Sequence, residues 1–177
     1  MSRVRFVAIT SVILVSAAAR IIPHPPNFTP ITAIALFGGA YFSKKWVAFA
    51  VPLTSLFISD LVLGYRPPYV VYASFALIVC IGLLLRRRRT TTAIAAAALA
   101  SSVLFFLVTN FGVWFFSGMY PKTSAGLIMC YMAAIPFFKN TVLGNALYTI
   151  LLFGGFAVAQ RYWPVLRSRD TVQPARV

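Results

Sequence analysis

The chain has 177 residues, of which 60% are hydrophobic and only 10% are charged, and its mean hydropathy is +0.87. Soluble domains carry about 25% charged residues, so this composition excludes a soluble globular domain and favours a surface that faces lipid. A formal net charge of +14 would indicate nucleic acid as the partner of a soluble protein. Here the Lys and Arg residues flank apolar runs, so we expect the lipid bilayer as a partner and no nucleic acid.

Six apolar segments follow one another along the chain. Their lengths and their Pro, Gly and Arg boundaries predict membrane helices at about 4–22, 29–43, 46–64, 69–85, 91–117 and 139–160. Pro136 and the pair Lys139-Asn140 interrupt the last apolar stretch, which predicts a re-entrant or surface segment at about 123–137. The sequence therefore predicts an all-α bundle of six transmembrane helices in one domain, residues 1–164, and a basic, disordered tail at 165–177.

The first segment has two interpretations. A basic start followed by FVAITSVILVSAAA is similar to a signal peptide, and Ala17–Ala19 would serve as its cleavage site. Removal would leave an odd number of spans, so we favour a first helix that is retained.

The basic residues predict the orientation of the helices. With the N-terminus in the cytoplasm, twelve of the sixteen Lys and Arg residues fall on the cytoplasmic side and four on the outer side. Lys and Arg are enriched in cytoplasmic loops, so both termini are expected to be cytoplasmic. The run Arg86–Arg89 is interpreted as an anchor that contacts anionic lipid.

Asp60 is one of only two acidic residues and lies inside the apolar run VPLTSLFISDLVLG. A carboxylate within a membrane span is costly, faces the protein interior and marks a ligand path or an ion pair. Asp60 is therefore expected either to contact a ligand or to pair with one of the outer basic residues, Arg20, Arg66 or Lys139.

The expected topology brings other polar and aromatic side chains to the outer third of the membrane, and these predict an outward-facing substrate pocket. Each also has a structural alternative as an interhelical hydrogen bonder, an interfacial aromatic or a loop residue. The candidate substrate-binding residues are Asp60, Asn110, Trp114, Asn140, Asn145, His24, Asn27 and Phe28.

The segment PHPPNFTP, residues 23–30, precedes the second helix and is rich in proline. It predicts an ordered, non-helical loop that is either a connector or an edge of the pocket. Asn27 and Thr29 are expected to cap the second helix. The pairs Gly38-Gly39 and Gly154-Gly155 are expected to be positions of close helix packing.

No catalytic arrangement is evident, because the sequence has a single His and no Glu. The two cysteines, Cys80 and Cys130, form no metal-binding motif. We therefore expect no enzyme activity, no metal and no cofactor.

The stretches RIIPHPPNFTPITAIALFGGAYF, SLFISDLVLG and FKNTVLGNALYTILLFGG resemble an uncharacterised family of bacterial membrane proteins assigned to transport. The chain is also similar to the substrate-binding S components of energy-coupling-factor (ECF) transporters, through Ser59-Asp60-Leu61, Gly64 and Gly144-Asn145. Two features depart from S components. The first helix offers Ala8, Val12 and Ser16 where those proteins have an Ala-x-x-x-Ala pattern, and the N-terminal Met-His of the metal-transporting versions is absent.

This resemblance implies a multi-pass protein of the bacterial cytoplasmic (inner) membrane that binds a small, vitamin-like or anionic solute for uptake. It further implies a coupling membrane subunit and ABC-type ATPases as partners. The alternative is an accessory or structural subunit of a larger membrane complex, in which the outer polar residues are internal bridges.

Overall fold

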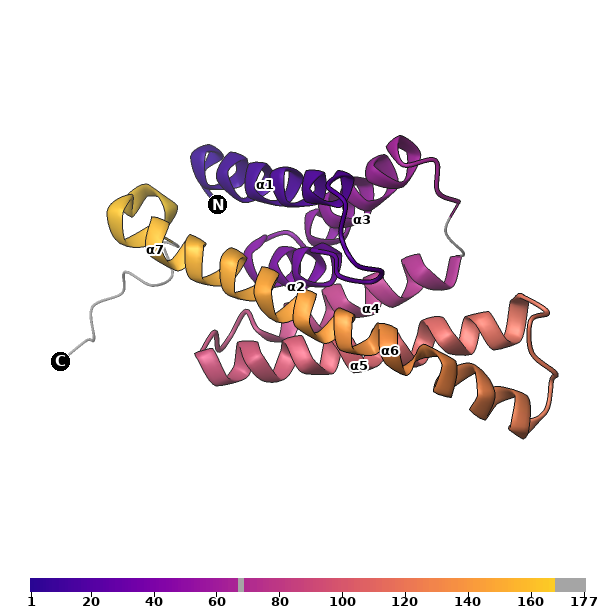
Figure 1. Cartoon of the computed structure of the whole chain (residues 1–177). Coiled ribbons are helices and arrows are strands. Elements are labelled where there is room, and N and C mark those ends of the chain that lie inside the picture. Colours follow the sequence, from indigo (N-terminus) through magenta and orange to yellow (C-terminus); the bar gives the residue numbers. More distant parts are fainter. Residues whose placement is uncertain (67–68, 168–177) are drawn as a thin grey trace.

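The computed structural model describes residues 1–66 and 69–167, and all regular structure in that part of the chain is helical (Figure 1). A 3-10 turn, Ala19–Ile21, extends the first helix, and a π-helical segment, Ile150–Gly154, joins the last two. The all-α prediction is confirmed. The helices are α1 (Arg3–Ala18), α2 (Ile31–Tyr41), α3 (Lys45–Val62), α4 (Tyr69–Leu84), α5 (Thr91–Phe116), α6 (Ser124–Thr149) and α7 (Gly155–Tyr162).

Within residues 1–66 and 69–167, four helical segments are long and apolar enough to cross a membrane. They are Arg3–Ile21, Lys45–Val62, Thr91–Phe116 and Ser124–Tyr162. The apolar helices α2 and α4 are shorter, at 11 and 16 residues. At about 1.5 Å per residue, α2 is about 16 Å long, whereas the hydrocarbon core of a bilayer is about 30 Å thick.

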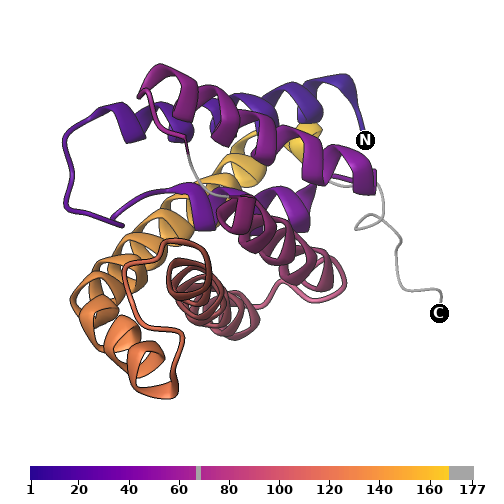
Figure 2. The same ribbon diagram turned by 90° about the vertical axis from the view of Figure 1, so that its right-hand side faces the viewer.

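The short helix α2 is the centre of the bundle, and each of its residues is buried. It packs against α1, α3, α4, α5 and α6, and Figure 2 shows α1 and α3 on one side of it with α4 and α5 on the other. The expected close packing at Gly38-Gly39 is confirmed. A Cβ at Gly39 would clash with the backbone of Val79 and Gly82 on α4, and one at Gly38 would clash with Pro52 on α3.

The last apolar stretch differs from the expectation. A single helix, α6, begins at Ser124 and continues through Pro136, so the predicted break between 123–137 and 139–160 is wrong. Proline removes only its own N–H donor, and packed membrane helices tolerate this loss. The expected close packing at Gly154-Gly155 is also wrong, because a Cβ at either position would meet nothing within 4 Å.

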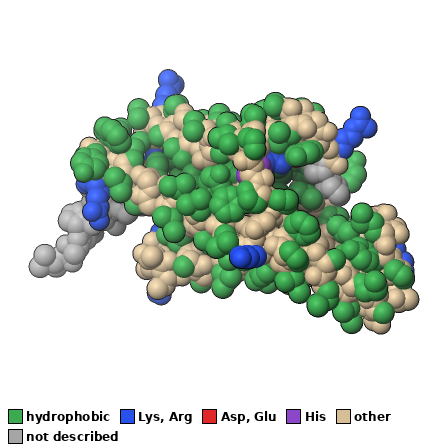
Figure 3. Space-filling model, in the orientation of Figure 1, with side chains coloured by type: hydrophobic (Ala, Val, Ile, Leu, Met, Phe, Trp, Pro, Cys, Tyr) green, Lys and Arg blue, Asp and Glu red, His purple; other side chains and the backbone are tan. Residues whose placement is uncertain are grey.

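The two ends of the bundle differ in character. The N-terminus, the start of α5 and α7 lie at one end, and the α5–α6 hairpin extends beyond the other helices at the opposite end (Figure 1). The face in Figure 3 is covered largely by hydrophobic side chains, as a lipid-facing surface requires.

The C-terminal tail was expected to be disordered from residue 165. Residues 168–177 of that tail lie outside the described residues. Within the described part, Leu166 is buried and its 3-10 turn, Pro164–Leu166, packs against α1.

The first helix is itself part of the core, since Ile9 and Ile13 are fully buried.

Candidate functional site

Asp60 is buried in an ion pair between the ends of two helices. Arg20, in the 3-10 turn after α1, donates to Asp60 Oδ1 at 2.7 Å and to the hydroxyl of Ser59. Tyr72 on α4 donates its hydroxyl to Asp60 Oδ2 at 3.0 Å. Both carboxylate oxygens are therefore engaged within the chain, and only 2% of Asp60 is exposed. The cluster joins α1, α3 and α4, about 22 Å along α3 from Lys45.

The other two basic candidates for pairing with Asp60 lie elsewhere. Arg66 is exposed in the loop after α3, and Lys139 is exposed on α6. Of the three alternatives left by the sequence, the structure has Arg20 as the partner of Asp60.

The loop of residues 22–30 returns from the end of α1 to the start of α2 and is attached to α6. Asn140 Nδ2 donates to the carbonyl of Pro26 at 3.0 Å, and the rings of Phe28 and Tyr148 are 6.3 Å apart. A Cβ at Gly144 would lie 3.1 Å from Phe28 Cα, so the glycine allows the loop to approach α6 closely.

The remaining residues of this loop have local roles. Asn27 has a φ of 63°, in the left-handed region that Asn tolerates better than most residues. His24 is exposed, and its Nδ1 lies 2.6 Å from the carbonyl oxygen of Ile22. The cap of α2 is Pro30, without a side-chain hydrogen bond, so the expected capping by Asn27 or Thr29 is wrong.

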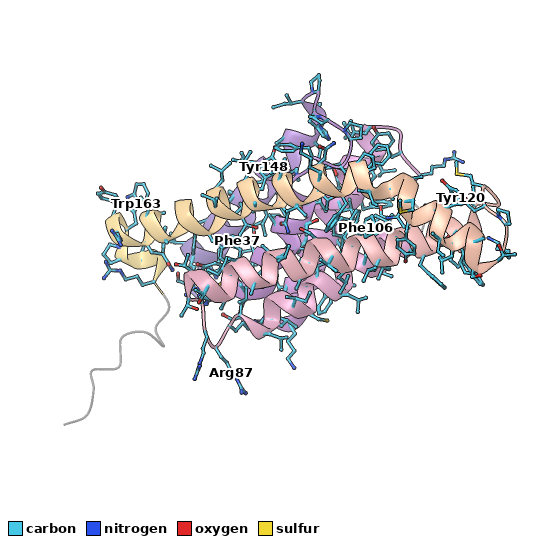
Figure 4. The ribbon with its side chains drawn as sticks, turned by 60° about the horizontal axis from the view of Figure 1, so that its bottom comes forward. Phe37, Arg87, Phe106, Tyr120, Tyr148 and Trp163 are labelled. Atoms are coloured by element: carbon cyan, nitrogen blue, oxygen red, sulfur yellow. The ribbon has the colours of Figure 1, made fainter. Side chains whose placement is uncertain are left out.

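A cavity of about 230 Å³ lies between the C-terminal half of α5 and the middle of α6. It is on the side of the bundle that was expected to face outward, and we call it the outer cavity. Its wall combines amide and hydroxyl side chains with aromatic rings, and one of these rings, Phe106, is labelled in Figure 4. On α5 it extends from Phe105 to Val113, about 21 to 33 Å from the start of the helix. It is lined by Asn27, Val71, Phe105, Phe106, Thr109, Asn110, Val113, Ala134, Phe137, Phe138 and Thr141.

The tip of the α5–α6 hairpin is closed by its own hydrogen bonds. The indole N–H of Trp114 donates to the carbonyl of Pro121 at 2.9 Å. The ammonium of Lys122 donates to the carbonyls of Trp114 and Phe115 at the end of α5. These bonds satisfy carbonyls that a helix end leaves unpaired, and they give Trp114 a structural role in the hairpin.

Asn145 lies away from the outer cavity. Its Nδ2 donates to the carbonyl of Ala98 at 2.7 Å and to Ser102 at 2.9 Å, and Thr149 donates to its Oδ1 at 3.3 Å. Because α6 begins at Ser124 instead of residue 139, Asn145 lies more than five turns into the helix. The sequence argument assigned it to the outer end of the last helix, and that assignment is wrong.

A larger cavity, of about 470 Å³, lies beside Asn145 between the N-terminal half of α5 and the C-terminal half of α6, and we call it the inner cavity. Ser102 and Asn145 lie toward one end of it and Arg89 toward the other. Both cavities follow one face of α5, since Ser102, Phe106 and Asn110 are spaced four residues apart. Polar side chains therefore line two separate cavities along this face, and the sequence predicted one pocket.

The structure thus separates the eight candidate residues. Asn27 and Asn110 line the outer cavity, Asn145 lines the inner one, and the others hold elements together or lie in the loop. Tyr72 was missed, although it lies within the first turn of α4, at the depth expected for Asp60. Other lining residues were not predicted: Thr109, Thr141, Phe106 and Phe138 of the outer cavity, and Tyr41, Arg89, Ser102 and Thr149 of the inner one.

Long apolar helices packed around buried polar side chains define this chain as a helical membrane protein. The chain belongs to DUF6580, a family of unknown function whose profile matches residues 1–166. No curated protein and no solved structure matches the chain.

Proposed function

We propose that this chain is the substrate-binding component of a small-solute uptake transporter in the bacterial cytoplasmic membrane, and that the solute binds in the outer cavity. This proposal includes six helices within the membrane, of which the short α2 is held inside the bundle by the others, and both termini in the cytoplasm. The observation that carries it is the lining of that cavity, where Asn27, Thr109, Asn110 and Thr141 stand among aromatic rings. Ligand pockets combine a mostly apolar wall with a few polar groups that fix orientation.

The volume and composition of the cavity favour a particular class of solute. At about 230 Å³, it is smaller than the typical pocket for a drug-sized ligand, about 300–1,000 Å³. The amide and hydroxyl groups hydrogen-bond the solute, and Phe106 and Phe138 pack against its apolar face. The four basic residues assigned to the outer side, against Asp60 alone, would attract a solute that carries a carboxylate to that side of the bundle, although none of them lines the cavity.

The residues outside the cavity position its walls. Asp60 and Arg20 fix α3 against α1, and Asn140 and Phe28 fix the loop that brings Asn27 to the cavity. Trp114 holds the tip of the α5–α6 hairpin. In this proposal these side chains act on binding only through the shape of the site.

The test is mild-detergent purification of the tagged protein from its native membranes, with mass spectrometry of the small molecules released from it. The wild type is compared with Asn110→Leu and Thr109→Val, and with Thr54→Val, an exposed threonine on α3, as the control. We expect one small molecule to be enriched with the wild type and the control. Its amount should fall about tenfold in each cavity variant, which corresponds to a loss of about 1.4 kcal/mol in binding free energy. Equal amounts in wild type and Asn110→Leu would place the solute elsewhere.

Mass spectrometry of the co-purifying chains separates this function from the second candidate, an accessory subunit. That candidate is favoured by Asp60, whose oxygens are both engaged within the chain. Recovery of a coupling membrane subunit with an ABC-type ATPase supports the transporter. Recovery of an unrelated complex, with no enriched small molecule, supports the accessory subunit.

A further inference from the structure

The inner cavity is apolar along most of its length and carries charge at one end. Its walls come mostly from small and aliphatic residues of α5, α6 and the π-helical segment Ile150–Gly154, and Tyr41 at the end of α2 also lines it. Several of these wall residues, including Ala95, Leu99, Ala146 and Ile150, are exposed on the helix surface. The cavity is therefore accessible from the side of the bundle, where the acyl chains of a bilayer lie.

The charged end is formed by arginine. The guanidinium of Arg89 lies over the ring of Tyr41, 4.8 Å from its centroid. Arg86 lies beside it and is fixed on α2, where its Nε donates to the carbonyl of Gly39 at 3.0 Å and its Nη1 to that of Ser43 at 3.1 Å. Burial lowers the pKa of Arg86, and the charge of Arg89 lowers it further. An anion at this position would offset the repulsion between the two guanidinium groups, Arg86 and Arg89.

The chain supplies no such anion from its described residues. Asp60 is the only acidic side chain among them, and it is paired with Arg20 at the other end of the bundle. The start of α5 adds to the positive potential, because the N-terminus of a helix favours negative charge. An anion bound by Arg89 must therefore come from outside the described chain.

We propose that the inner cavity binds an anionic phospholipid, with one acyl chain between α5 and α6 and the phosphate on Arg89. The apolar wall suits the acyl chain, and the guanidinium of Arg89 suits the phosphate. A lipid of the adjacent leaflet has its phosphate at the membrane surface and its acyl chain toward the membrane centre, and the two parts of the cavity follow the same order. This site does not depend on the outer cavity or on any solute bound there.

The test is native mass spectrometry of the delipidated protein titrated with dioleoyl phosphatidylglycerol, and with dioleoyl phosphatidylcholine as the zwitterionic lipid of equal chains. Arg89→Gln removes the charge at the cavity, and Arg87→Gln is its matched control, because Arg87 points away from the bundle (Figure 4). Ala95→Phe fills the cavity, and its control is Ala96→Phe, since Ala96 is exposed but does not line it. Glycerol phosphate is the probe for the head group alone.

We expect the wild type and both controls to retain phosphatidylglycerol about tenfold more tightly than Arg89→Gln or Ala95→Phe, because each removes one part of the recognition. We also expect weaker binding of phosphatidylcholine. Equal losses in Arg87→Gln and Arg89→Gln would overturn the proposal in favour of diffuse attraction between the arginines and lipid. Unchanged binding by Ala95→Phe, or full competition by glycerol phosphate, would overturn the role of the acyl chain.

Discussion

Arg20 and Asp60, forty residues apart in the sequence, form an ion pair of 2.7 Å that joins the end of the first helix to the third. Tyr72 occupies the second carboxylate oxygen, so the only acidic side chain of the described residues is neutralised within the chain. The pair explains how a carboxylate is accommodated inside an apolar span.

The first prediction concerns this pair. Asp60→Asn or Arg20→Gln alone leaves a buried charge without its partner, and each should destabilise the protein by about 3 kcal/mol. Unfolding in mixed micelles, followed by circular dichroism, measures the loss. The control is Arg66→Gln, an exposed arginine, which should change stability by less than about 0.5 kcal/mol.

The double variant distinguishes an ion pair from two independent effects. Arg20→Gln combined with Asp60→Asn should be less destabilised than the sum of the single variants by about 1 kcal/mol or more. Strict additivity would mean that the two side chains act separately and would contradict the pairing.

The contact between α2 and α4 gives the second prediction. Gly39→Ala would push a methyl group against the backbone of Val79 and Gly82, which cannot rotate away as a side chain can. The cost should be about 1–3 kcal/mol, as for other overpacked sites. Gly154→Ala is the control, because it meets nothing within 4 Å, and it should leave stability unchanged or raise it by up to about 1 kcal/mol. Equal effects of the two substitutions would argue against close packing at Gly39.

The third prediction concerns the orientation of the helices in the membrane. In a background with Cys80→Ala and Cys130→Ala, a cysteine introduced by Ser117→Cys should react with a membrane-impermeant thiol reagent in intact cells. One introduced by Ser43→Cys should react only after permeabilisation, because Lys44 and Lys45 follow it. The reverse pattern would invert the bundle and move the outer cavity to the cytoplasmic side.

The loop of residues 22–30 gives the fourth prediction. Asn140→Ala removes the bond to Pro26, and the loop should then be cleaved faster by proteinase K added to the protein in nanodiscs. Lys139→Ala is the matched control, because Lys139 is exposed on the same helix, and it should not change the cleavage rate. A cleavage rate unaffected by Asn140→Ala would mean that Phe28 alone holds the loop.

The helix boundaries were predictable because apolar length and flanking Pro, Gly and Arg residues are local signals. The helices α1 to α5 begin and end within four residues of the expected positions. The continuity of α6 was not predictable in the same way, because the effect of Pro136 depends on whether neighbouring helices accommodate it.

The candidate site was predictable only in part. The isolation of Asp60 in the sequence left two alternatives, contact with a ligand or pairing with one of three basic residues. The choice of Arg20 depends on how the chain turns after α1. Asn145 was misplaced because the start of its helix was misplaced. The attachment of Pro26 to Asn140, 114 residues later, arises from tertiary packing and has no local signal.

The burial of α2 has a consequence for how the protein enters the membrane. A helix of 11 residues is about half as long as the hydrocarbon core is thick, so it cannot be integrated as an independent span. The loop of residues 22–30 that leads to it carries backbone groups that lipid alone would leave unsatisfied. We therefore expect α2 to enter the membrane together with α1 and α3, as one packed group of helices.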